Sequence, residues 1–248
     1  MLLSIAKNVS RLNAVLSPEG EVKPVKAAGV WVFAKEPSTQ TYNVLMGEMV
    51  KNDPKKPETH MFDKTYSGFS GKSKVNEGPI DTAVRELQEE TFGIFGTDQD
   101  MLSIVASDKT TVLKNMGWSK YPVATFLIEV DYSDEYIEKF NTLRSDTSEL
   151  SKLKWVPLDS IWWSLDNNMV EGSGMSWREY NSAKNLTSLF TPLNGVYSRT
   201  ELEMKKNALK HNLRVFAKDE NIHIADYVAR TFMEYESDIK TLFPSVSM

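Results

Sequence analysis

The chain has 248 residues and a formal net charge of −5 at pH 7, with 41% hydrophobic and 25% charged residues. These fractions are typical of a globular protein, and the negative balance argues against nucleic-acid binding over the whole surface. The absence of cysteine excludes disulfides, thiol catalysis and thiolate metal sites. No apolar run reaches the roughly 18 residues of a membrane span, so we expect a cytoplasmic protein without membrane contact.

Residues 1–24 form an N-terminal segment with two possible interpretations. The first part carries Lys7 and Arg11 and no acid, as a transit peptide would. Two basic residues are few for targeting, which favours an amphipathic helix over residues 1–16. Its apolar side would consist of Leu2, Ala6, Val9 and Leu16.

Short segments rich in β-branched and aromatic residues predict strands. They lie at residues 27–34, 41–50, 65–70, 102–106, 110–113 and 123–130. Prolines at 54 and 57 predict a loop over residues 51–64. Residues 134–144 are predicted to be helical. Beyond the flexible break at residues 172–174, helices are expected near residues 177–189, 199–216 and 223–242.

A further helix is predicted to start at Pro79, because the first helical position needs no N–H partner. Asp81 lies in the first turn, where the helix dipole favours a negative charge. The spacing i, i+3, i+4, i+7 of a buried stripe follows in Ile80, Ala83, Val84 and Leu87. A glycine-led loop, residues 71–76, precedes this helix and delivers Glu77 to its start.

Three carboxylates of this helix, on Glu86, Glu89 and Glu90, share one arc, because successive residues turn by about 100°. They repel one another, and Arg85 alone does not neutralise them together with Glu77. A divalent cation would. Carboxylate oxygens without nearby Cys or His suit Mg²⁺ or Mn²⁺ rather than zinc. The alternative is a solvated acidic face with no site.

This spacing resembles the signature of the Nudix hydrolases, G-x5-E-x7-R-E-hydrophobic-x-E-E. The matching residues are Gly71, Glu77, Arg85, Glu86, Leu87, Glu89 and Glu90. The resemblance implies that Glu86, Glu89 and Glu90 are the metal ligands. It also implies structural roles for Gly71, Glu77 and Arg85, the last two bracing the loop against the helix.

The chain departs from the family pattern at two places. Thr91 and Phe92 both precede Gly93, where the family usually has one residue before the glycine. This extra residue falls after the metal-binding positions and concerns the helix exit. Ser70 stands where many members have a second glycine.

Two residues near the motif are candidates for substrate binding, Lys72 and Trp118. A loop tryptophan can stack on a nucleotide base, or it can close over the edge of the core. The run of residues 71–73 ends like a phosphate-binding P-loop. That motif needs a glycine where this chain has Tyr66, which excludes an ATPase of this kind.

A second stretch, starting at Glu149, resembles the late segment of the family. A strand ends in Trp155-Val156-Pro157, and a short helix follows. The resemblance implies that Glu149 is an extra acid from a loop, either a metal ligand or the base that activates water. Glu138 and Asp146 are the alternatives. The candidate catalytic residues are therefore Glu90, Glu149 and Glu89.

The resemblance implies an α/β fold over residues 25–165, an α/β/α sandwich with a mixed sheet. Residues 166–248 are expected to be a helical extension that packs on this core as a lid, a homodimer surface or a substrate selector. The three histidines lack ligand spacing and are not expected to be catalytic.

The implied activity is that of a pyrophosphohydrolase with Mg²⁺ or Mn²⁺ as cofactor. It would cleave the diphosphate linkage between a nucleoside diphosphate and another group. The acidic balance favours a small nucleotide such as ADP-ribose, a dinucleotide or a nucleotide sugar. Hydrolysis at a capped RNA 5′ end is the alternative that a basic C-terminal region favours. Its residues are Arg199, Lys205, Lys206, Lys210, Arg214 and Lys218. A catalytically inactive nucleotide-binding module is the alternative from another class.

Overall fold

A mixed sheet lies at the centre of the computed structural model. The structure describes residues 14–16, 22–50, 65–116, 122–145, 148–168, 175–179, 213–217 and 220–245. Within these ranges nine strands form one sheet in the order β10-β11-β5-β4-β3-β8-β7, with β6 paired to β3 and β9 to β4. The strands are β3 (Ala27–Lys35), β4 (Tyr42–Met49), β5 (Thr65–Ser67), β6 (Phe69–Lys72), β7 (Thr111–Met116), β8 (Pro122–Glu129), β9 (Leu150–Pro157), β10 (Leu213–Ala217) and β11 (Glu220–Ile224).

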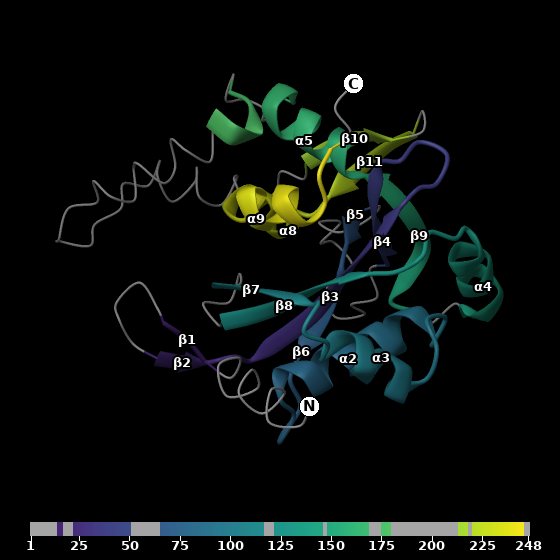
Figure 1. Ribbon diagram of the computed structural model, residues 1–248, viewed down its shortest axis with the longest axis vertical. Coiled ribbons are helices and arrows are strands. Elements are labelled where there is room, and N and C mark those ends of the chain that lie inside the picture. Colours follow the sequence, from purple (N-terminus) through teal and green to yellow (C-terminus); the bar gives the residue numbers. More distant parts are fainter. Residues whose placement is uncertain are drawn as a thin grey trace.

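Helices cover both faces of this sheet (Figure 1). One layer contains α2 (Pro79–Thr91), α3 (Asp98–Val105) and α4 (Glu135–Leu143), and the other contains α5 (Leu158–Asn167), α8 (Asp226–Glu234) and α9 (Glu236–Leu242). The pairs β3–β8 and β11–β5 are parallel, and the other pairs of the sheet are antiparallel. The predicted α/β sandwich with a mixed sheet is thereby confirmed.

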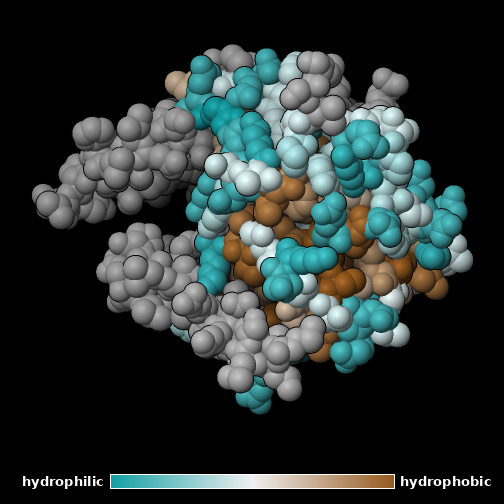
Figure 2. All heavy atoms as spheres, viewed as in Figure 1, coloured by the Kyte–Doolittle hydropathy of each residue, from teal (hydrophilic) through white to brown (hydrophobic). Residues whose placement is uncertain are grey.

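Strand β3 explains why the molecule has two apolar cores. Its side chains alternate between the faces of the sheet, and both faces are buried, so the strand is apolar almost throughout. Trp31 and Phe33 enter the core beneath α8 and α9, while Val30 and Val32 enter the core beneath α2. Figure 2 shows apolar residues in the middle of one face of the molecule, between α8 and α2, with hydrophilic residues around them.

The predicted strand at residues 102–106 is wrong, because this segment belongs to helix α3. Thr97 caps the helix: its hydroxyl accepts from the Asp100 N–H at 3.3 Å, and Asp100 Oδ2 accepts from the Thr97 N–H at 2.8 Å. Such a capping box starts a helix at the next residue. Met101 and Val105, one turn apart, are then buried against the sheet.

The predicted helices of the C-terminal region are corrected in two places. Residues 213–217 form strand β10 rather than the end of a helix, and residues 220–224 form strand β11 before α8 begins. Leu213 and Val215 are buried while Arg214 is exposed, an alternation of period two that a helix would not bury on one side. The remaining residues of the predicted helix 199–216 lie outside the described residues.

The predicted N-terminal helix is corrected where the structure describes it. Residues 14–16 form strand β1 (Ala14–Leu16), which pairs antiparallel with β2 (Val22–Pro24). Hydrogen bonds to the neighbouring strand outweigh the weak helical spacing of this segment. Residues 1–13 and the predicted loop 51–64 lie outside the described residues. Among the helices that the structure describes, none is both long and apolar enough to cross a membrane.

Candidate active site

Helix α2 carries the candidate ligands, and it begins at Pro79 as the sequence predicts. Gly78 is the N-cap residue, and Asp81 Oδ2 accepts a hydrogen bond from its N–H at 3.1 Å. Pro79 occupies the first helical position. Ala83 and Leu87 are completely buried on the side that packs against the sheet. The burial of this stripe turns the adjacent carboxylates toward strand β6 and the glycine-led loop.

The helix exit accommodates the extra residue that distinguishes the chain from the family pattern. Phe92 adopts a left-handed conformation (φ 56°, ψ 33°), and Gly93 follows with φ 68°. A left-handed phenylalanine costs about 1–2 kcal/mol. Its ring packs against Phe140 of α4, with a centroid distance of 5.7 Å. The left-handed cap therefore lies after Thr91, beyond the last carboxylate of α2 at Glu90.

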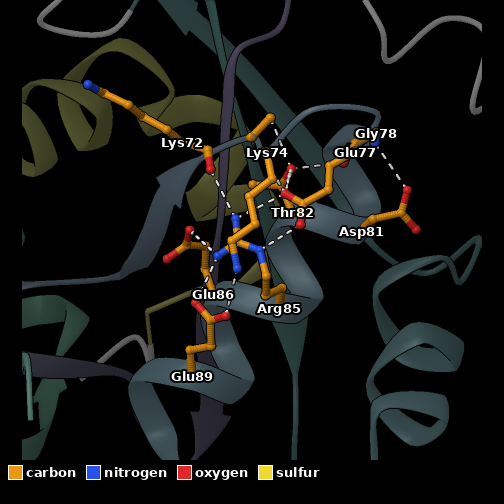
Figure 3. A network of polar contacts seen from close by, with 10 residues as sticks. Lys72, Lys74, Glu77, Gly78, Asp81, Thr82, Arg85, Glu86 and Glu89 are labelled. Carbon is orange, nitrogen blue, oxygen red and sulfur yellow. Dashed lines mark hydrogen bonds and ion pairs between the residues drawn. The ribbon is translucent and has the colours of Figure 1, made fainter.

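Arg85 lies at the centre of a polar network that joins the helix to the loop (Figure 3). Its Nε and Nη2 donate to the two carboxylate oxygens of Glu77, at 2.7 and 3.0 Å. Its Nη1 donates to Glu86 Oε1 at 2.6 Å and to Glu89 Oε2 at 2.8 Å. Nη2 also donates to the backbone carbonyl of Lys72 at 2.9 Å. One guanidinium thus offsets part of the repulsion among three carboxylates.

Glu77 holds the loop to the start of the helix. Besides Arg85, its carboxylate accepts from the Lys74 N–H at 2.8 Å and from the Thr82 hydroxyl at 3.2 Å. The hydrogen bonds from Arg85 contribute most to lowering the pKa of Glu77, to about 2. Glu77 therefore stays ionised across the physiological range and keeps Arg85 in place.

Gly71 makes room for Glu86. A Cβ atom at Gly71 would lie 2.1 Å from Glu86 Oε1, closer than any real contact. The Glu86 side chain is 12% exposed. Burial raises its pKa, and the hydrogen bond from Arg85 opposes this change. A glycine at position 71 is therefore a steric requirement for the observed place of the Glu86 carboxylate.

Glu90 lies beside the same strand. Its Oε2 accepts a hydrogen bond from the Ser70 N–H at 3.2 Å. Burial, followed by the negative charges of Glu86 and Glu149, raises the pKa of Glu90 well above its usual value. Glu149 is exposed, just before β9, and its charge also raises the pKa of Glu86. The structure thus brings an acid far along the chain close to the acids of α2.

Glu89 is the most exposed of the three helix acids, with 53% of its side chain accessible. Lys74 Nζ donates to Glu89 Oε1 at 3.0 Å, and this contact is the main cause of the lowered Glu89 pKa. The side chain of Lys72 points away from this network (Figure 3). Trp118 and Asp146 lie outside the described residues, and Glu138 is exposed on α4. The role of Lys74 had no sequence signal beyond its place in the loop.

The donor set suits a hard divalent cation by its chemistry. Four carboxylates act on one another electrostatically, those of Glu86, Glu89, Glu90 and Glu149. Oxygen-only donors with excess negative charge are typical of Mg²⁺ and Mn²⁺ sites. In the conformation described, Arg85 holds Glu86 and Glu89. Among the described residues, no group of three or more His, Asp or Glu side chains already converges with metal-ligand geometry.

A scan of protein-family models and a search of curated proteins found no match to the chain. Solved structures do match, at low identity. A C. elegans Ap4A hydrolase is 13% identical, with 64% of this chain and 98% of that chain covered and a TM-score of 0.35. The M. smegmatis Nudix hydrolase RenU is 18% identical, with 73% and 99% covered and a TM-score of 0.32. The NUDIX domain of Shewanella oneidensis NrtR, complexed with ADP ribose, is 12% identical, with 71% and 94% covered and a TM-score of 0.36. The solved structures that this chain resembles thus include Nudix hydrolases, the family whose motif its residues 71–90 match.

Proposed function

We propose that this protein hydrolyses the diphosphate linkage of a nucleoside diphosphate joined to another group, with Mg²⁺ or Mn²⁺ as cofactor. The observation that carries the proposal is the gathering of Glu86, Glu89 and Glu90 beside the motif loop, where Arg85 contacts the first two and the Ser70 N–H the third. Gathering like charges costs free energy unless a cation offsets them. The proposed hydrolase unit spans residues 25–165.

Glu86, Glu89 and Glu90 would hold the metal. When bound, it neutralises charge on the phosphate oxygens and lowers the pKa of water. Water attacks phosphorus, and a carboxylate of Glu90 or Glu149 accepts its proton. The bond from phosphorus to the bridging oxygen breaks, which releases a nucleoside monophosphate and the phosphorylated partner group. Arg85 and Glu77 keep the loop and helix in register during this step.

The test is incubation of the purified protein with small nucleotide diphosphates and one capped RNA, with Mg²⁺, Mn²⁺ or chelator, and identification of products by mass. We expect metal-dependent release of a nucleoside monophosphate from a small nucleotide. A Michaelis constant that rises steeply with salt would instead point to RNA. Nucleotide binding without turnover in any metal would contradict hydrolysis and support a binding module.

Glu90→Gln is expected to lower kcat by at least about 100-fold while the protein stays folded, because the variant loses a ligand charge and a candidate base. Glu135→Gln is the matched control, since Glu135 is exposed on α4 and has no proposed role at the site, and it should keep kcat within about twofold. Near-normal turnover in Glu90→Gln would overturn the assignment of Glu90.

A further inference from the structure

The C-terminal segment that contains β11 and α8 lies directly beside strand β5, which leads into β6. Strand β11 pairs in parallel with β5, with Ile224 opposite Tyr66. The Ala225 N–H donates to the Tyr66 carbonyl at 3.0 Å, and helix α8 begins at the next residue. The first turn of α8 is therefore fixed next to the chain that leads into β6.

Tyr227, in this first turn, contacts Ser67 of that chain. Its hydroxyl is hydrogen-bonded to Ser67 Oγ, and Ser67 Oγ donates to the Gly68 carbonyl at 2.9 Å. The negative charge of Glu90 acts on the Tyr227 phenol, which places the two side chains in one electrostatic environment.

The backbone of residues 67–71 also fixes the positions of two candidate ligands, Glu90 and Glu86. The Ser70 N–H donates to Glu90 Oε2 at 3.2 Å, and Gly71 leaves the space that Glu86 occupies. On its other side this segment packs closely against β3, because a Cβ atom at Gly29 would lie 2.3 Å from Ser70 Cβ. Residues 67–71 are thus held between β3 and Tyr227.

We propose that Tyr227 is a positioning residue for the metal site. By fixing Ser67 it holds the segment whose Ser70 N–H donates to Glu90, so the C-terminal segment completes the site that α2 carries. Residues that hold ligands in place commonly contribute 10–100-fold to metal affinity or activity. The part of this inference that concerns turnover rests on the proposed hydrolysis; the part that concerns metal binding does not.

The test compares Tyr227→Phe with the wild type by Mn²⁺ affinity, kcat and KM. The substitution keeps the ring, which packs partly buried against the core beneath α8, and removes only the hydroxyl. We expect about tenfold weaker Mn²⁺ binding and about tenfold lower kcat, with KM nearly unchanged. A purely structural role would lower stability and leave these three quantities of the folded protein unchanged.

Tyr235→Phe is the matched control. Tyr235 follows α8, and its hydroxyl donates to the backbone carbonyl of Lys114, in β7. This variant also loses a phenol oxygen from the C-terminal segment, but one that does not contact residues 67–71. Mn²⁺ affinity and kcat should therefore stay within about twofold of wild type. An equal loss in both variants would overturn the proposal.

Ser67→Ala removes the same hydrogen bond from the other side and serves if Tyr227→Phe does not fold. Its effect should be at least that of Tyr227→Phe, because the Ser67–Gly68 hydrogen bond is lost as well, and the double variant should be no worse than Ser67→Ala alone. Unchanged Mn²⁺ affinity in a folded Tyr227→Phe or Ser67→Ala protein would overturn the proposal. Weakened Mn²⁺ binding without wild-type turnover of any substrate would support the positioning role and contradict the proposed hydrolysis.

Discussion

Arg85 is the residue on which the charges of α2 depend. It binds Glu77 with two nitrogens and shares a third between Glu86 and Glu89. A bidentate pair restrains both side chains, so the guanidinium keeps its place while the other two acids are free to exchange partners. This division separates Glu77, which has a structural contact with Arg85, from Glu86 and Glu89, which are proposed as metal ligands.

Glu77→Gln is expected to lower the free energy of unfolding by about 2 kcal/mol at pH 7, because a charge-assisted bond to Arg85 is lost. The folded-state pKa of Glu77 is about 2, below its ordinary value of 4.5. A lowered pKa stabilises the fold above the ordinary value, and this contribution disappears as the pH falls toward 2. Urea unfolding of both proteins should therefore give a difference that shrinks between pH 5 and pH 2. A difference independent of pH would contradict this account, and Glu138→Gln controls for charge alone.

Gly71→Ala is expected to weaken Mn²⁺ binding and to lower kcat by more than about tenfold, because the new methyl group displaces the Glu86 carboxylate. The control is Gly78→Ala, where a Cβ atom would meet Asp81 Oδ2 at 3.2 Å and the backbone has negative φ. That variant should keep Mn²⁺ affinity, measured by calorimetry. Wild-type affinity in Gly71→Ala would contradict the view that metal binding needs the Glu86 carboxylate in its observed place.

At the scale of elements, the sequence predicts those helices whose first and last residues are marked by capping residues or prolines nearby in the chain. Helix α2 has a proline at its first position and, two residues later, an acid that caps it. Helix α3 has an equally local signal in Thr97 and Asp100. The sequence interpretation missed it because its isoleucine and valine favour strands, while the cap and the burial of Met101 and Val105 decide for a helix.

Asp81→Ala is expected to cost about 1 kcal/mol of stability, because the Gly78 N–H loses its acceptor and the helix dipole loses a negative charge. Metal affinity should remain, since Asp81 lies on the exposed side of the first turn. Chemical denaturation measures the first quantity and calorimetry the second. Asp108→Ala, in the exposed turn after α3, should change neither; an equal cost in both variants would exclude a capping effect.

At the scale of the molecule, the C-terminal helices form one face of the fold (Figure 1). Phe232 of α8 stacks on Trp31 of the central strand, with a centroid distance of 4.6 Å, and Phe243 stacks on Phe33 at 4.0 Å. Arg178 links α5 to α9 through Asp166 and Glu236, each at 2.5 Å. These contacts tie the last part of the chain to the sheet that carries the site.

Phe232→Ala is expected to lower the free energy of unfolding by about 3–5 kcal/mol, because a completely buried ring leaves a cavity. Unfolding in urea should remain a single transition, since α8 and the sheet share one core. Leu242→Ala, with 38% of the leucine exposed, should cost less than about 1 kcal/mol. A second transition in Phe232→Ala, with Mn²⁺ affinity retained, would mean that α8 folds separately from the site.

The sequence alone determined the start of helix α2 at Pro79 and the fixed spacing of Gly71, Glu77, Arg85 and the three helix acids. These features depend on helical geometry and on neighbours a few residues away. Only the tertiary structure decided that Glu149 lies near Glu90, that β10 and β11 join the sheet, and that Tyr227 reaches Ser67. That last contact joins residues 160 positions apart, and pairing over such a distance depends on sheet order and packing, which no local pattern encodes.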